Sequence, residues 1–217
     1  LGRPTDAPSH RAVRPRIRPG VVSMREIIRA DILGMEVYGA ERKQRRTEIS
    51  ALKEHRRLAV GPFASIHFEC YETMWMQIHE MLYIEKGGEE QIADELAAYN
   101  PLIPDGRELV ATLLLGIPGE PERRARILST LGGIEDRIAI EIDGEVIAAL
   151  PEGDVERSRA DGKTSAVHFL HFPFSDRQVV AFRDPVSRVR LSISHPEYGH
   201  IAVFSVTLRE ALSDDFD

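Results

Sequence analysis

The sequence contains a single cysteine, Cys70, and this scarcity limits the chemistry that the chain can support. One cysteine excludes an internal disulfide, and it excludes zinc or iron–sulfur sites built from cysteines alone. Such sparing use of cysteine suits the reducing cytoplasm, where we expect the protein to reside. Cys70 continues the apolar side of the alternating segment 63–70, so we expect a small buried side chain. Its place just before a helix favours a thiolate, which leaves a nucleophile as the alternative.

Long apolar runs and the common catalytic signatures are also missing. No apolar segment approaches the roughly 20 residues that a membrane span requires. The sequence has no glycine-rich dinucleotide loop, no P-loop, no HExxH zinc motif and no GxSxG nucleophile elbow. These absences disfavour a membrane protein, a Rossmann or nucleotide-hydrolysing enzyme, and a serine hydrolase.

Beyond the first 23 residues, acidic residues outnumber basic ones. Those residues carry five arginines and one aspartate, so their +4 leaves −11 for the remainder of a chain whose net charge is −7. An acidic body disfavours binding to nucleic acid and to anionic membranes. Residues 1–23 also contain four prolines and little apolar material. We therefore expect a disordered or foreign tail ahead of a natural start at Met24, and a single domain over residues 24–217.

The sequence does contain a clear change of hydrophobic period. Segments 31–56, 69–87 and 89–99 have apolar residues at helical spacing, whereas the second half mostly alternates with a period of two. Strands are expected at 58–60, 63–70, 107–117, 137–142, 145–150, 163–172, 188–195 and 201–206. The pattern predicts an α+β fold, in which helices mainly from the N-terminal half pack on a mainly antiparallel sheet from the C-terminal half.

The helix expected within 69–87 combines a thick apolar stripe with many proton- or metal-binding groups. Met74, Ile78 and Leu82 recur at helical spacing beside Trp75, and glycines after Lys86 are expected to end the helix. The exposed part of such a Met/Trp-rich stripe is compatible with a homodimer contact. The preceding charged stretch, 41–46, is expected to be solvated, because acidic residues interrupt its basic ones.

Three histidines are the strongest candidates for chemistry. His168 and His195 each fall on the apolar side of an expected strand, where an imidazole must find a polar partner. His200 follows His195 across an expected turn, 196–200. If the strands are neighbours, these imidazoles could converge with Glu72 or Glu80 of the central helix and hold iron, manganese or zinc. The alternative is that each histidine is a core residue hydrogen-bonded to the backbone.

Four blocks of sequence resemble the bacterial DUF3501 family, a domain of unknown function. The blocks are Glu72-Thr-Met-Trp-Met-Gln-Ile-His-Glu-Met-Leu82, Tyr99-Asn-Pro-Leu-Ile-Pro104 with Glu108-Leu-Val-Ala-Thr112, Lys163-Thr-Ser-Ala-Val-His-Phe169, and His195-Pro-Glu-Tyr-Gly-His200. The resemblance spans about residues 24–213. It implies no settled activity. It does imply an association with rubrerythrin-like and iron–sulfur oxidoreductase proteins, whose genes are often found beside those of the family.

Two functional hypotheses follow from these features. The leading one is a metal- or small-ligand-binding accessory protein of a bacterial redox or oxidative-stress system, in which His168, His195, His200, Glu72 and Glu80 line one pocket. Whether it is an enzyme is left open. The alternative is a non-catalytic interaction or homodimerising domain whose histidines are purely structural.

Overall fold

The computed structural model describes residues 26–153 and 164–217, so the expected tail, 1–23, lies outside the described residues. Two antiparallel sheets form the body of the molecule. The five-stranded sheet has the order β1 (Arg57–Val60), β2 (Ala64–Phe68), β3 (Glu108–Leu115), β7 (Val167–Pro173) and β6 (Leu150–Pro151). The four-stranded sheet has the order β5 (Glu145–Ala148), β4 (Ile138–Ile142), β8 (Val189–His195) and β9 (Tyr198–Val203).

The main core lies between the two sheets. Strands β2, β4 and β8 alternate buried with more exposed residues, as their period of two requires. Ile66 and Leu170 of the first sheet and Ile140 and Leu191 of the second are fully buried within one apolar cluster. Each such side chain contributes about 1.5–3 kcal/mol when it is removed from water, so this layer holds the sheets face to face.

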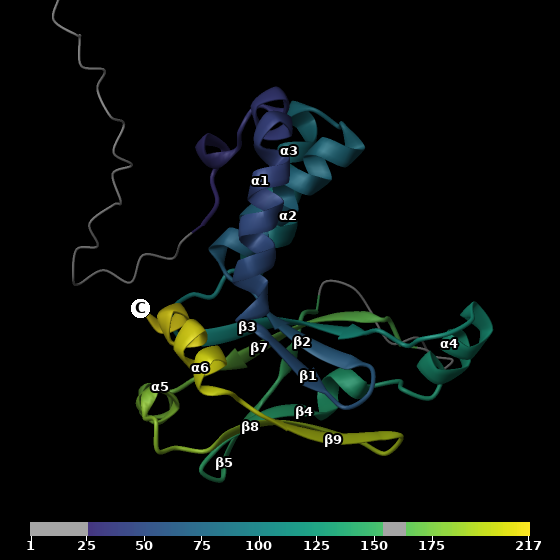
Figure 1. Cartoon of the computed structure of the whole chain (residues 1–217), viewed down its shortest axis with the longest axis vertical. Coiled ribbons are helices and arrows are strands. Elements are labelled where there is room, and N and C mark those ends of the chain that lie inside the picture. Colours follow the sequence, from purple (N-terminus) through teal and green to yellow (C-terminus); the bar gives the residue numbers. More distant parts are fainter. Residues whose placement is uncertain (1–25, 154–163) are drawn as a thin grey trace, which may run out of the picture.

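The helices occupy two places around the sheets (Figure 1). Helices α1 (Met35–Glu54), α2 (Tyr71–Glu85) and α3 (Glu89–Tyr99) stand on the outer side of the five-stranded sheet. Met74, Ile78 and Ile92 of this group form a second apolar cluster with Val110 of β3. The shorter helices α4 (Pro121–Leu128), α5 (Asp176–Arg183) and α6 (Val206–Ser213) flank the body. None of the helices in the described ranges has the length and apolarity that a membrane crossing requires.

The predicted α+β class is confirmed. Helices are concentrated in the N-terminal half and strands in the C-terminal half, and all strand pairing is antiparallel. The strands divide into two sheets, and the N-terminal half contributes β1 and β2 to the first of them. Much of the Met/Trp-rich stripe of α2 packs inside the chain, since Met74 and Met76 are buried.

Tyr198 fastens the second sheet to the first. Its hydroxyl donates to the carbonyl of Val60 over 2.6 Å and accepts from the amides of Ala64 at 3.0 Å and Phe63 at 3.2 Å. Gly61 follows β1 in the turn that leads to β2 and has a φ of +73°. A Cβ at this position would lie 2.5 Å from the His200 ring. The β1–β2 turn therefore packs closely against the start of β9, and position 61 has no room for a side chain.

Local predictions are wrong at several segment ends. The strand expected at 145–150 divides into β5 and β6, which belong to different sheets, and the strand expected at 201–206 ends at Val203. Residues 196–200 were expected to form a turn, but His195 pairs with Tyr198, so the turn is tighter and His200 lies within β9. Helix α2 ends with Lys86 in the left-handed conformation, at φ 58°, and a glycine does not occupy that position. The pairing of His195 with Tyr198 sets the boundary of β9, and the hydrogen bond from the Lys86 amide to the Leu82 carbonyl closes the last turn of α2.

Candidate functional site

His168 and His195 do face apolar surroundings, but the prediction that they come from neighbouring strands is wrong. His168 lies on β7 of the five-stranded sheet and His195 on β8 of the four-stranded sheet. Both side chains are buried. Strand β7 pairs with β3 and β6, whereas β8 pairs with β4 and β9. The sequence pattern could establish which side of a strand is apolar, but not which strands are adjacent.

Each of these histidines has its own local partners. The Nε2 atom of His168 lies 2.9 Å from the Thr164 hydroxyl and 2.9 Å from the Ser165 carbonyl, and its Nδ1 lies 3.7 Å from the Glu135 carboxylate. His195 accepts a hydrogen bond from the Glu197 amide at Nδ1 and donates one to the Gly132 carbonyl from Nε2, and each bond is 3.2 Å long. These contacts are those expected of core histidines.

The other three predicted site residues also lie in separate environments. The His200 ring packs on the Tyr198 ring, with centroids 4.4 Å apart. Glu72 is exposed in the first turn of α2. Glu80 binds Arg42 and Tyr38. Among residues 26–153 and 164–217, no three His, Cys, Asp or Glu side chains are placed to hold a metal ion together.

Glu80 leads to a different site, on the surface between α1 and α2. Its carboxylate accepts two hydrogen bonds from the Arg42 guanidinium, both 2.8 Å, and a third of 2.6 Å from the Tyr38 hydroxyl. The Arg42 guanidinium also lies over the Tyr83 ring, 4.9 Å from its centroid. A bidentate carboxylate and an aromatic face together fix the direction of a side chain that is otherwise flexible.

The charges of this cluster are firmly set. The hydrogen bonds from Arg42 lower the pKa of Glu80 to about 2, against the opposing effect of burial. The hydrogen bond to Glu80 raises the pKa of Arg42. Burial, followed by the hydrogen bond to Glu80, raises the pKa of Tyr38. Glu80 is therefore an anion and Arg42 a cation throughout the physiological range.

Arg42 opens onto a groove of about 770 Å³. The lining residues are Gly39, Arg42, Lys43, Arg46, Thr47, Ser50, Ala51, Glu54 and Tyr83. Neither Lys43 nor Arg46 forms an ion pair with another residue of the described chain. The lining thus contains three cations, of which Arg42 is already paired with Glu80, and one carboxylate, Glu54. The groove is therefore a positive region on an acidic protein. We call it the basic groove.

The stretch 41–46 is mostly exposed, as predicted, although Arg42 and Arg45 are half-buried. Its charges divide between two sides of the helix. Arg45 binds Glu41 over 2.6 Å, and its guanidinium lies over the Trp75 ring, 4.6 Å from the centroid. Arg42, Lys43 and Arg46 face the basic groove. Only Tyr38 of the 20 residues of α1 is buried, so this helix is open along most of its surface. The alternation of acidic and basic residues predicted one solvated face and gave no sign of the groove.

His79, whose spacing predicted a place on the polar side of the helix, is instead buried and supports this region from inside. It donates from Nδ1 to the Trp75 carbonyl over 2.7 Å and accepts from the Leu33 amide at Nε2 over 3.0 Å. Its ring stacks on Trp75, with centroids 3.7 Å apart. Because Nε2 acts as an acceptor, this arrangement needs the neutral imidazole. Its place four residues after Trp75, on the same side of the helix, is the sequence signal that could have marked it.

We expect His79 to contribute to a loss of stability on mild acidification, alongside His67, whose pKa burial lowers to about 4. Burial lowers the pKa of His79 below its usual 6.5. The unfolded chain then binds a proton that the folded chain resists, so stability is full above about pH 7 and falls as pH decreases through 6.5 towards the folded pKa. Between pH 7.5 and 5.5 this loss can reach about 1.4 kcal/mol. Urea unfolding at the two pH values measures it. The loss should shrink in His79→Phe and persist in the control His55→Gln, an exposed histidine; equal losses in all three proteins would contradict the assignment.

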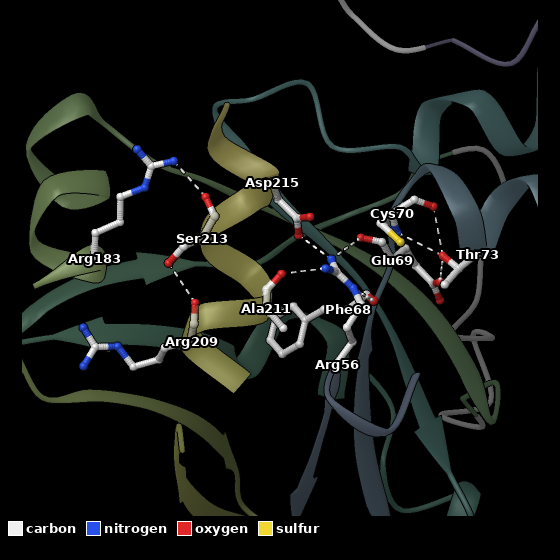
Figure 2. A network of polar contacts seen from close by, with 10 residues as sticks. All are labelled: Arg56, Phe68, Glu69, Cys70, Thr73, Arg183, Arg209, Ala211, Ser213 and Asp215. Carbon is white, nitrogen blue, oxygen red and sulfur yellow. Dashed lines mark hydrogen bonds and ion pairs between the residues drawn. The ribbon is translucent and has the colours of Figure 1, made fainter. Parts of the chain in front are cut away.

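A second polar cluster is buried and structural (Figure 2). The Arg56 guanidinium donates to the carbonyls of Phe68 at 3.1 Å, Glu69 at 2.9 Å and Ala211 at 2.9 Å, and it forms an ion pair with Asp215. These contacts join the C-terminal helical segment to the corner between β2 and α2. They involve side chains that are only 6% and 7% exposed, for Arg56 and Asp215 respectively, so they do not reach a ligand.

Glu69 and Cys70 belong to the same corner. The Glu69 carboxylate accepts from the hydroxyls of Thr73 at 2.7 Å and Thr112 at 2.5 Å. Cys70 is buried, as predicted, and burial raises the pKa of its thiol to about 11. A protonated, enclosed thiol fits the small-hydrophobe interpretation and disfavours the nucleophile.

Comparison with known proteins gives a consistent result. The family model described as "Protein of unknown function (DUF3501)" matches residues 26–216. No curated protein matches the chain. A crystal structure described as a novel protein of unknown function from Burkholderia pseudomallei K96243 is 36% identical, with a TM-score of 0.81. The match covers 89% of this chain and 100% of that chain.

Proposed function

Because the chain belongs to the DUF3501 family, which is described only as being of unknown function, we propose from the chemistry of the basic groove that the protein binds a small anionic ligand. The observation that carries the proposal is the fixed guanidinium of Arg42 beside two cations without ion-pair partners in the described chain, Lys43 and Arg46. Arginine in a fixed orientation suits the bidentate recognition of phosphate or carboxylate groups.

The dimensions of the groove favour a ligand with two neighbouring anionic groups. Arg42 and Arg46 are one helical turn apart, so their Cβ atoms lie about 5–6 Å from each other. The volume of about 770 Å³ accommodates a small organic molecule. Thr47 and Ser50 add hydroxyl groups to the lining, which includes neither histidine nor cysteine. A diphosphate or a dicarboxylate has the required spacing of charges.

This proposal retains small-ligand binding from the hypothesis derived from the sequence. It places the ligand in the basic groove instead of in a pocket lined by the three histidines. Glu80 remains in it, as the residue that positions Arg42. The histidines leave it, because their partners are local and structural. The association of the family with rubrerythrin-like and iron–sulfur oxidoreductase proteins makes a redox system the setting that we propose. The chemistry of the groove itself does not depend on that setting.

We expect the protein to bind inorganic pyrophosphate more tightly than inorganic phosphate at equal ionic strength, measured by isothermal titration calorimetry. Lys43→Gln and Arg46→Gln should each weaken pyrophosphate binding by about tenfold, since a hydrogen bond to a charged group contributes roughly 1.5–3 kcal/mol. Glu54→Gln, which removes the carboxylate of the lining, should strengthen binding several-fold.

The control is Arg57→Gln, which removes the same charge from an exposed position on β1 outside the groove. It should bind pyrophosphate as the wild type does, apart from a small effect of net charge. If pyrophosphate produced no heat of binding with the wild type, the proposal would be refuted. Equal weakening in Arg46→Gln and Arg57→Gln would reduce the effect to general electrostatics and would refute it as well.

A further inference from the structure

The four-stranded sheet has an outer face of unusual composition. Antiparallel sheets that expose one face normally carry polar side chains there. Here Val146 of β5 is 63% exposed, and Ile201 and Val203 of β9 are 62% and 72% exposed. This sheet lies at the end of the molecule opposite α1–α3 (Figure 1). Val146 lies at the β5 edge of this face, and Ile201 and Val203 lie at the β9 edge. Exposed β-branched side chains at both edges of a sheet face point to an interaction surface.

The strand register places these residues in two transverse rows. One row runs Ala148, Ala139, Ser192 and Ile201 across β5, β4, β8 and β9. The other runs Val146, Glu141, Arg190 and Val203 across the same strands. In the first row the small side chains of Ala139 and Ser192 lie at the centre of the sheet. In the second row the β-branched side chains of Val146 and Val203 lie at its edges. The face therefore combines low central positions with higher edges, which suits close packing against another sheet.

One ion pair, Glu141–Arg190, lies at the centre of the second row. Arg190 contacts both oxygens of Glu141, at 2.7 and 2.9 Å, and their side chains are 47% and 26% exposed. The two rows therefore carry one positive and one negative charge and are neutral. The chain as a whole has a net charge of −7, so two copies repel each other over most of their surfaces.

We infer that the outer face of the four-stranded sheet binds the same face of a second copy of this chain, through a two-fold axis. A two-fold interface must be self-complementary, because each patch meets itself in a rotated orientation. An Arg190–Glu141 pair satisfies this condition: rotation about an axis between the two side chains places each arginine beside the carboxylate of the other copy. The apolar residues at both ends of the rows then bury each other. This surface is distinct from the Met/Trp-rich helix and from the basic groove.

The decisive experiment exchanges the charges. Sedimentation and light scattering at about 50 µM protein detect a dimer with a Kd in the micromolar range or below. The wild type should have the mass of two 24.4 kDa chains. Glu141→Arg, with two arginines in the row, and Arg190→Glu, with two glutamates, should each be monomeric because like charges meet across the axis. An equimolar mixture of the two variants should form a heterodimer, and the double variant with both exchanges should again form a homodimer.

Apolar substitutions test the packing. Val203→Lys should produce a monomer, whereas Val186→Lys, at an 85% exposed valine outside the sheet, should leave the dimer intact. Thermal melting confirms that each variant is folded, since breaking an exposed ion pair alters stability by only about 0–1 kcal/mol. A monomeric wild type would overturn the inference. So would charge variants that remain dimeric on their own, or a mixture that stays monomeric. Pyrophosphate binding should persist in all these variants, which separates this test from that of the proposed function.

Discussion

Replacing Asp215 by alanine should lower the free energy of unfolding by about 3–5 kcal/mol. The substitution leaves the Arg56 guanidinium, which is 6% exposed, without its carboxylate. Its remaining partners in the cluster are backbone carbonyls, which accept hydrogen bonds but do not neutralise the charge (Figure 2). A buried charge that loses its counterion pays most of its desolvation penalty without compensation.

The matched control is Asp214→Ala, which removes an exposed carboxylate from the adjacent position and should change stability by less than about 0.5 kcal/mol. The double variant Arg56→Met with Asp215→Leu should lose less stability than Asp215→Ala, because no charge is left buried. Urea unfolding at one fixed protein concentration provides the measurement, since association would otherwise contribute to the apparent stability. A loss below about 1 kcal/mol in Asp215→Ala would show that water or chain relaxation reaches Arg56.

Replacing Tyr198 by phenylalanine should lower the free energy of unfolding by about 2–3 kcal/mol. The change keeps the ring, which packs on Phe63 with centroids 4.3 Å apart, and removes only the hydroxyl. That hydroxyl serves the Val60 carbonyl and the Ala64 and Phe63 amides together. Removing it leaves backbone groups of the β1–β2 turn without a partner in a region closed by the second sheet.

Tyr99→Phe is the control for the chemistry of the substitution. Among residues 26–153 and 164–217, the Tyr99 hydroxyl has a single long contact, 3.4 Å, with the Gln77 side chain. Its loss should therefore change stability by less than about 1 kcal/mol. The same urea titration applies. If Tyr198→Phe were no more destabilising than Tyr99→Phe, the hydroxyl would not be the fastening between the sheets, and ring packing alone would account for their attachment.

Local patterns predicted most of the secondary structure correctly. The helix over 89–99 and the Asp143–Gly144 hairpin occur where periodicity and turn chemistry place them, with φ values of 50° and 94° at the two turn residues. The cap formed by Ser175 with Gln178, three residues apart, is a local feature of the same kind. These features depend on residues close together in the chain, so the sequence contains the information directly.

The candidate site could be predicted only in part. Glu80 was among the predicted residues, but its role in positioning Arg42 depends on the packing of α1 against α2, across a separation of 38 residues. His168 and His195 were correctly placed on apolar faces, yet their strands belong to different sheets. Hydrophobic alternation reports which side of a strand is buried, and it contains nothing about which strand lies next to it.

The sequence by itself determined the α+β class, the alternation of each long strand, the burial of Cys70 and the family to which the chain belongs. The tertiary structure alone decided the division of the strands into two sheets, the local partners of the histidines, the basic groove and the uncovered outer face of the second sheet. The physical reason is the range of the interactions involved. Periodicity and capping act over a few residues, whereas pairing of strands and burial of charges join segments that are far apart in the chain.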